Sequence, residues 1–81
     1  MIIVEIYSPA VDAGYDFQID EDTQVKDAAA SAAEMIARKN GSEGASGTDA
    51  ALYDTVRQHE LDRDRTLKEN GVRSGMKLLL V

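Results

Sequence analysis

The pattern of hydrophobic and polar positions predicts a hairpin at the start of the chain. Residues 2–7 (IIVEIY) are apolar and β-branched, which favours a strand. Residues 15–20 (YDFQID) alternate strictly between apolar and polar, which indicates a strand with one wet face. A proline and a glycine between the two segments are typical of a turn, so we expect the strands to be neighbours. The apolar face of the second strand consists of Tyr15, Phe17 and Ile19.

The pattern then changes to the period of a helix. Apolar residues recur three or four positions apart between Val25 and Ile36, and most of them are alanine, whose small side chain lets a helix pack close to a sheet. Asp22 or Thr23 is expected to cap the first turn, and the pair Asn40-Gly41 is expected to end the helix. The predicted buried stripe consists of Val25, Ala28 or Ala29, Ala32 and Ile36, with Met35 beside it.

The second half of the chain is less uniform. Residues 41–48 are rich in glycine and serine and predict a flexible loop. The segment after them has two interpretations: a helix capped by Thr48, which local propensity favours, or a strand over Leu52–Val56. Leu67 and a corner at Asn70-Gly71-Val72 precede a final strand, MKLLLV, whose continuous apolar run predicts a central position in a sheet.

Length, composition and charge limit the possible classes of protein. The chain has 81 residues and no cysteine, so we expect a single domain over residues 1–81 with one aliphatic core and no disulfides. Its net charge of −6 argues against a nucleic-acid partner. The first apolar run is too short for a signal peptide or a membrane span, which predicts a cytoplasmic protein without direct membrane insertion.

The residues that could carry chemistry do not form a recognisable catalytic pattern. His59 is the only histidine and lies among charged residues, where an exposed surface position is expected. The acids Asp20, Glu21 and Asp22 lack the spacing and the glycine of an EF-hand loop, so capping of the helix explains them better than calcium. The run GSEGASG lacks the lysine of a phosphate-binding loop. We therefore expect no enzyme, no cofactor and no metal.

The order of elements, together with the ending ELDRDRTLKENGVRSGMKLLLV, resembles ubiquitin-like proteins. The resemblance implies an α+β fold of the β-grasp type, with one main helix packed on a mixed sheet of four or five strands. It favours the strand interpretation of Leu52–Val56. It also implies five core positions in the last third of the chain: Leu61, Leu67, Val72, Leu78 and Leu80.

Among ubiquitin-like proteins, the chain is most similar to the small bacterial YukD/EsaB family. The similarity lies in the pattern L-x-x-x-G-V-x-x-G-x-x-L-x-L that starts at Leu67. Members of that family are associated with type VII (Ess/Yuk) secretion systems of Gram-positive bacteria and have no established catalytic residues. The resemblance implies a non-catalytic cytoplasmic accessory or regulatory protein. Its partners would be the membrane ATPase or other components of the secretion machine.

Two other functions are compatible with the sequence. One is an auxiliary ubiquitin-like adaptor of another bacterial complex, such as an oxygenase. The other is a conjugated or sulfur-carrying modifier, which acts through a terminal Gly-Gly tail; the chain ends instead at Val81, so we expect no conjugation if this is the natural terminus. Ubiquitin-like proteins generally bind partners through the exposed sheet face, and the oligomeric state stays open. On this chain that face is expected to include Thr55, Arg57, Lys77 and Leu79.

Overall fold

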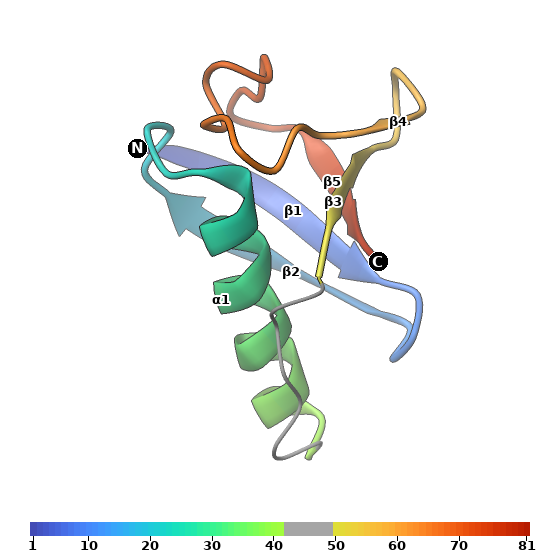
Figure 1. The fold of residues 1–81 in the computed structure, drawn as a ribbon. Helices are drawn as coiled ribbons and strands as arrows, with labels where there is room; N and C mark the ends of the chain where they lie inside the picture. The colour runs from blue at the N-terminus through green and yellow to red at the C-terminus, as the bar shows by residue number, and fades with distance from the viewer. Residues whose placement is uncertain (42–49) are drawn as a thin grey trace.

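The computed structural model describes residues 1–41 and 50–81, and in these residues one helix packs on a mixed five-stranded sheet (Figure 1). The order of the strands across the sheet is β2-β1-β5-β3-β4. The elements are β1 (Ile2–Ser8), β2 (Ala13–Ile19), α1 (Val25–Lys39), β3 (Leu52–Asp54), β4 (His59–Glu60) and β5 (Lys77–Leu80). This arrangement confirms the predicted α+β architecture.

The first and last strands meet at the centre of the sheet. β1 and β2 form the predicted antiparallel hairpin, in which Val4 stands opposite Phe17. β5 runs parallel to β1 on its other side, and β3 runs antiparallel to β5. The apolar run of the last strand is explained by this central position, since Leu78 and Leu80 are buried.

Helix α1 covers one face of the sheet with the predicted stripe of small side chains. Val25, Ala28, Ala29, Ala32 and Ile36 are all buried, and Met35 at the side of the stripe is 40% exposed. The helix ends at Lys39 as expected, with Asn40 as its C-cap and Gly41 at a φ of 73°.

The predicted capping of the helix start by Asp22 or Thr23 is wrong. The helix begins at Val25, and the preceding Gln24 makes no capping hydrogen bond through its side chain. The amides of Val25 and Lys26 instead donate to the carbonyls of Arg65 and Arg63, at 2.9 and 3.2 Å. Backbone carbonyls of a loop distant in the sequence therefore accept hydrogen bonds from helix amides, a role that a capping side chain normally has.

The segment after residue 50 is a strand, but a shorter one than predicted. β3 ends at Asp54 rather than Val56, because an Asp54 carboxylate oxygen accepts the backbone amides of Val56 and Arg57. These bonds, with a φ of 60° at Gln58, turn the chain into the short strand β4. The predicted flexible loop at 41–48 lies, apart from Gly41, outside the described residues.

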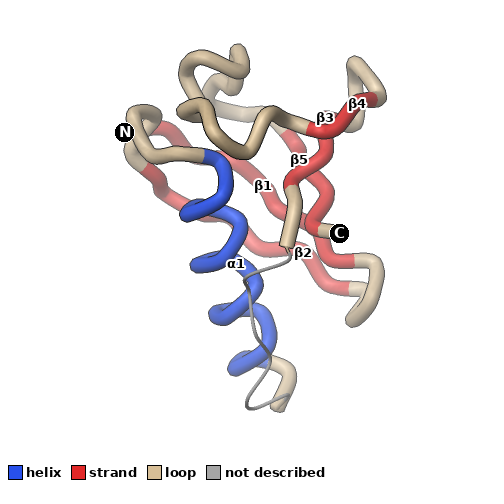
Figure 2. Tube along the Cα trace, in the orientation of Figure 1, coloured by secondary structure: helices blue, strands red, loops and turns tan. Residues whose placement is uncertain are grey.

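The loop between β4 and β5 supplies the remaining core (Figure 2). Its corner forms the predicted tight turn: the Val72 amide donates to the Leu67 carbonyl at 3.0 Å, and Gly71 has a φ of 77°. All five core positions implied by the resemblance are buried: Leu61, Leu67, Val72, Leu78 and Leu80. Within the described residues, no helix has the length and apolar character needed to cross a membrane.

Candidate functional site

The sheet has an outer face, which we define as the side opposite α1. Along β1 the side chains alternate: Val4 and Ile6 are buried under the helix, so Ile3, Glu5 and Tyr7 belong to the outer face. The same alternation places Lys77 and Leu79 of β5 and Tyr53 of β3 on the outer face. The outer face therefore carries apolar side chains that the helix does not cover.

Three of these residues form a row across the three middle strands. Leu79 stands opposite Tyr7 on one side and opposite Tyr53 on the other. All three side chains are partly exposed. Side chains in register on adjacent strands stand next to one another on the same face. We call this row of two aromatic residues and one leucine the strip.

Polar contacts hold Tyr7 in place at one end of this row. Its hydroxyl donates to an Asp12 carboxylate oxygen, and the Lys77 ammonium lies 5.7 Å from the centre of its ring. The hydrogen bond to Asp12, together with partial burial, raises the pKa of Tyr7 above 10.0. Gly14 stands opposite Tyr7, and a Cβ there would lie 3.3 Å from the ring. The lack of a side chain at Gly14 therefore leaves room for the Tyr7 ring beside it.

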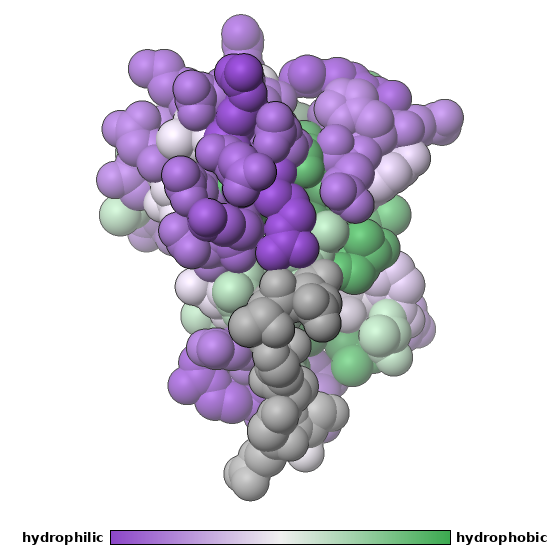
Figure 3. Space-filling view, viewed as in Figure 1, coloured by the Kyte–Doolittle hydropathy of each residue, from purple (hydrophilic) through white to green (hydrophobic). Residues whose placement is uncertain are grey.

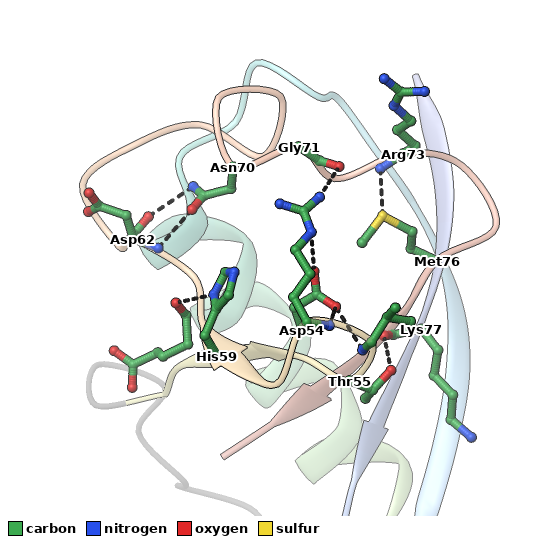
Figure 4. A network of polar contacts seen from close by, with 12 residues as sticks. Asp54, Thr55, His59, Asp62, Asn70, Gly71, Arg73, Met76 and Lys77 are labelled. Atoms are coloured by element: carbon green, nitrogen blue, oxygen red, sulfur yellow. Dashed lines mark hydrogen bonds and ion pairs between the residues drawn. The ribbon is translucent and has the colours of Figure 1, made fainter.

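The structure brings together three of the four residues expected on the sheet face. Lys77 and Leu79 are on the outer face, and the Thr55 hydroxyl donates to the Lys77 carbonyl at 3.1 Å (Figure 4). Arg57 lies apart from them, because it follows the turn after β3. Its guanidinium pairs with Asp54 and donates to the Gly71 carbonyl at 3.2 Å, so it belongs to a structural contact rather than to the face.

Asp54, the last residue of β3, is fully buried and ionised. Burial alone would raise the pKa of its carboxyl group. The amides of Arg57 and Val56, followed by the charges of Arg57 and His59, outweigh burial and hold the pKa below 3.8. One carboxylate oxygen accepts both amides, and the other makes an ion pair of 3.3 Å with the Arg57 Nε. Asp54 therefore fixes the turn that ends β3, and it faces the helix side of the sheet.

The other candidate residues are placed where they support structure. His59 is exposed on β4 as expected, with its Nδ1 3.0 Å from the Glu60 carbonyl oxygen. The Glu21 carboxylate pairs with the N-terminal amine at 3.1 Å, and Asp20 accepts the Asp22 amide. The described residues contain no group of three or more acidic or histidine side chains that could hold a metal ion.

An apolar hollow of about 500 Å³ lies beside the C-terminal residue. In Figure 3 hydrophobic residues gather at the middle right, near the C-terminus, and polar residues cover the upper part of the molecule. The lining of the hollow includes Pro9, Ala33, Ala50 and Leu80. Ser8 is the only polar residue among the described residues that line it. This lining supplies shape but little that could orient a reacting group.

Two residues of the outer face were not recognised in the sequence as surface residues. Tyr7 was part of an apolar run, and Tyr53 lay in the segment with two interpretations. Alternation was the signal that could have found both. Each is one position removed from a residue that faces the helix, Ile6 and Leu52 respectively.

No protein-family model and no curated protein sequence matches the chain. Several solved structures do. A computationally designed protein based on human erythrocytic ubiquitin is 27% identical, with a TM-score of 0.68 over 100% of this chain and 90% of its own. A de novo design based on ubiquitin is 15% identical, with a TM-score of 0.70 over 99% and 85%.

A natural domain has a similar structure. The N-terminal ubiquitin-like domain in the 4931431F19Rik protein is 18% identical, with a TM-score of 0.71 over 99% of this chain and 72% of that chain. All three TM-scores lie between 0.68 and 0.71 over nearly the whole chain, so the arrangement of helix and sheet is shared with these structures. The chain therefore has the ubiquitin-like β-grasp fold that its sequence predicted.

Proposed function

We propose that this ubiquitin-like chain is a non-catalytic protein-binding module that presents the outer face of its sheet to a partner. The observation that carries the proposal is the strip formed by Tyr7, Leu79 and Tyr53, which is apolar, partly exposed and bordered by charged residues. Aromatic and aliphatic side chains grouped in this way are typical of the centre of protein interfaces.

The proposed partner is a component of a type VII secretion system at the cytoplasmic side of the membrane. The ending from Leu67 to Leu80, similar to that of the YukD/EsaB family, supports this choice. In this role the chain would act as an accessory or regulatory protein without covalent attachment to its partner. The alternative is an adaptor of another bacterial complex, such as an oxygenase.

A pull-down from detergent-solubilised membranes of the native host tests both parts of the proposal. The tagged chain is compared with two variants, Leu79→Gln on the outer face and Val56→Gln as a control. Val56 is 83% exposed in the turn after β3 and lies outside the strip. Bound proteins are identified by mass spectrometry, and thermal melting establishes that both variants fold.

We expect the secretion ATPase or its membrane partners to be recovered by the wild type and by Val56→Gln. Recovery by Leu79→Gln should fall about tenfold, as for the loss of one central contact of about 1.4 kcal/mol. Equal recovery by both variants would exclude the outer face as the binding surface. A soluble oxygenase complex would favour the alternative, and a mass adduct on the terminal carboxylate would contradict non-covalent action.

A further inference from the structure

Strand β2 leaves one edge of the sheet open. In the described part of the chain β2 pairs only with β1. The Glu5 amide and the Ile3 carbonyl bond to residues just before β5, so the backbone groups of odd-numbered β1 residues point away from β2. The even-numbered residues of β1 therefore form the backbone hydrogen bonds to β2. Their partners in the register are Tyr15, Phe17 and Ile19, so the backbone groups of these three residues point toward β1. The backbone groups of the residues in between, Gly14, Asp16 and Gln18, consequently point to the open edge.

A groove of about 280 Å³ lies between this edge and α1. Its apolar lining consists of Phe17, Ile19, Ala28, Ala32 and Met35. The 40% exposure of Met35 shows that the groove is open to solvent. A strand added to β2 would bond to the amides and carbonyls of Asp16 and Gln18, and every second side chain would point to the helix side, over this lining. The open edge and the groove are therefore complementary parts of one site for an extended chain.

The charges at this edge specify the occupant. Asp16 stands directly opposite Glu5 on the outer face, an unfavourable arrangement for two carboxylates. Lys77 is the register neighbour of Glu5 on the far side, and no ion pair reaches Asp16 within the described residues. Asp20 lines the groove itself. A lysine or arginine on an added strand would stand beside Asp16 and relieve this repulsion.

We propose that the open edge of β2 binds an extended segment of a partner protein by strand addition. Its apolar side chains enter the groove beside α1, and its alternate basic side chains face Asp16. This site is separate from the strip of Tyr7, Leu79 and Tyr53, so it does not depend on the function proposed for that strip. A second copy of the chain fits less well, since pairing two β2 edges would bring both Asp16 carboxylates to one seam between molecules of net charge −6.

Nuclear magnetic resonance with a defined peptide tests the proposal. The probe is an acetylated, amidated seven-residue peptide of alternating lysine and valine, and its counterpart carries glutamate in place of lysine. At saturation, the lysine peptide should slow hydrogen exchange of the Asp16 and Gln18 amides by about tenfold or more. It should also shift the Met35 methyl resonance. The glutamate peptide should do neither.

Two variants separate the backbone bonds from the charge. Gln18→Pro removes an outward amide, which an edge strand tolerates, and it should abolish binding, whereas Gln18→Thr keeps the amide and should bind. Asp16→Lys should weaken binding of the lysine peptide about two- to fivefold. Thermal melting checks that each variant folds. Strand addition would be overturned if the lysine peptide did not bind, if hydrogen exchange of the edge amides stayed unchanged at saturation, or if Gln18→Pro bound as well as the wild type. Equal binding of the two peptides would overturn the preference for a basic segment.

Discussion

At the scale of single residues, Arg57 connects two turns that are far apart in the sequence. Its Nε lies 3.3 Å from a carboxylate oxygen of buried Asp54, and its Nη2 lies 3.2 Å from the Gly71 carbonyl oxygen. A Cβ at position 71 would lie only 2.6 Å from that Nη2. Gly71 also has a φ of 77°, which disfavours residues with a side chain. The corner therefore favours glycine because of its φ, and a side chain there would also displace the Arg57 guanidinium.

A matched pair of glycine substitutions separates these reasons. Gly71→Ala and Gly75→Ala both place alanine at a positive φ, which costs about 1 to 2 kcal/mol. Only the first displaces Arg57, because a Cβ at Gly75 has open space around it. Denaturant unfolding should show a greater loss of stability for Gly71→Ala, and the difference should vanish in an Arg57→Ala background. Equal losses of stability for the two variants in the wild-type background would mean that the Arg57 side chain moves aside without destabilising the fold.

Thr66 and Glu69 form a reciprocal cap at the start of the turn that leads to Gly71. The Thr66 amide donates to the Glu69 carboxylate at 2.9 Å, and the Glu69 amide donates to the Thr66 hydroxyl at 3.0 Å. Thr66→Ala should lower the free energy of unfolding by about 1 kcal/mol, since the Glu69 amide loses its acceptor. Thr66→Ser keeps the hydroxyl and should retain most of that stability. Urea unfolding curves of the two variants, if superimposable, would contradict the capping role.

At the scale of elements, the alanine stripe sets how closely α1 approaches the sheet. Ala29 is fully buried, whereas Ala37 is partly exposed on the same helix. Ala29→Leu should cost about 1 to 3 kcal/mol, because the added atoms must be accommodated between helix and sheet. Ala37→Leu adds the same atoms where solvent leaves room, and it should change the melting temperature little. A similar loss in both variants would indicate an effect on the helix itself rather than on packing.

The elements differ in how far the sequence determined them. Strict alternation identified β2, and the spacing from Val25 to Ile36 identified the buried face of α1, because both patterns are local. The start of α1 was not predictable, since the carbonyls that accept its first amides belong to residues 63 and 65. The end of β3 was also missed, because a continuous strand over Leu52–Val56 was expected, whereas the buried Asp54 carboxylate accepts two amides of the following residues and turns the chain.

The candidate site also has features that local sequence patterns predicted and features that depend on residues distant in the sequence. Lys77 and Leu79 were correctly placed on the sheet by alternation in the last strand, although their binding role stays a prediction. The row that they complete depends on which strands are neighbours, and the pairing of β5 with both β1 and β3 involves residues far apart in the sequence. Arg57 was assigned to the face only because β3 was expected to continue to Val56. Long-range pairing thus decides the site, as it decides the cap of α1.

At the scale of the whole molecule, three carboxyl groups with lowered pKa values lie in connecting segments or at the end of a strand. A hydrogen bond from the N-terminal amine lowers the pKa of Glu21 below 4.5, and the Thr66 amide and hydroxyl lower that of Glu69. Asp54 stays below 3.8 despite its burial. All three groups bind protons more weakly in the folded chain than in the unfolded chain.

Stability should therefore decrease as the solution becomes acidic. A carboxyl group with a lowered pKa in the folded state stabilises it fully at pH values above the ordinary 4.5 of Glu or 3.8 of Asp. That contribution decreases below these values, where the unfolded chain takes up protons first, and it is lost as the pH falls through the lower pKa of the folded state. The free energy of unfolding in urea should be nearly constant around neutral pH and fall below about pH 5.

The variant Asp54→Asn measures how much of this acid dependence of the free energy of unfolding comes from the buried Asp54 carboxylate. At neutral pH the variant should be less stable than the wild type by about 1 to 3 kcal/mol, because the ionised carboxylate accepts two amides and pairs with Arg57. The difference should shrink as the pH falls below 3.8, because Asp54 is protonated first in the unfolded chain and then, at its lower pKa, in the folded chain. Asp64→Asn, whose carboxylate is 88% exposed, controls for the removal of one negative charge. A gap between wild type and Asp54→Asn that stayed constant with pH would show that the loss comes from altered packing of the turn rather than from the charge of Asp54.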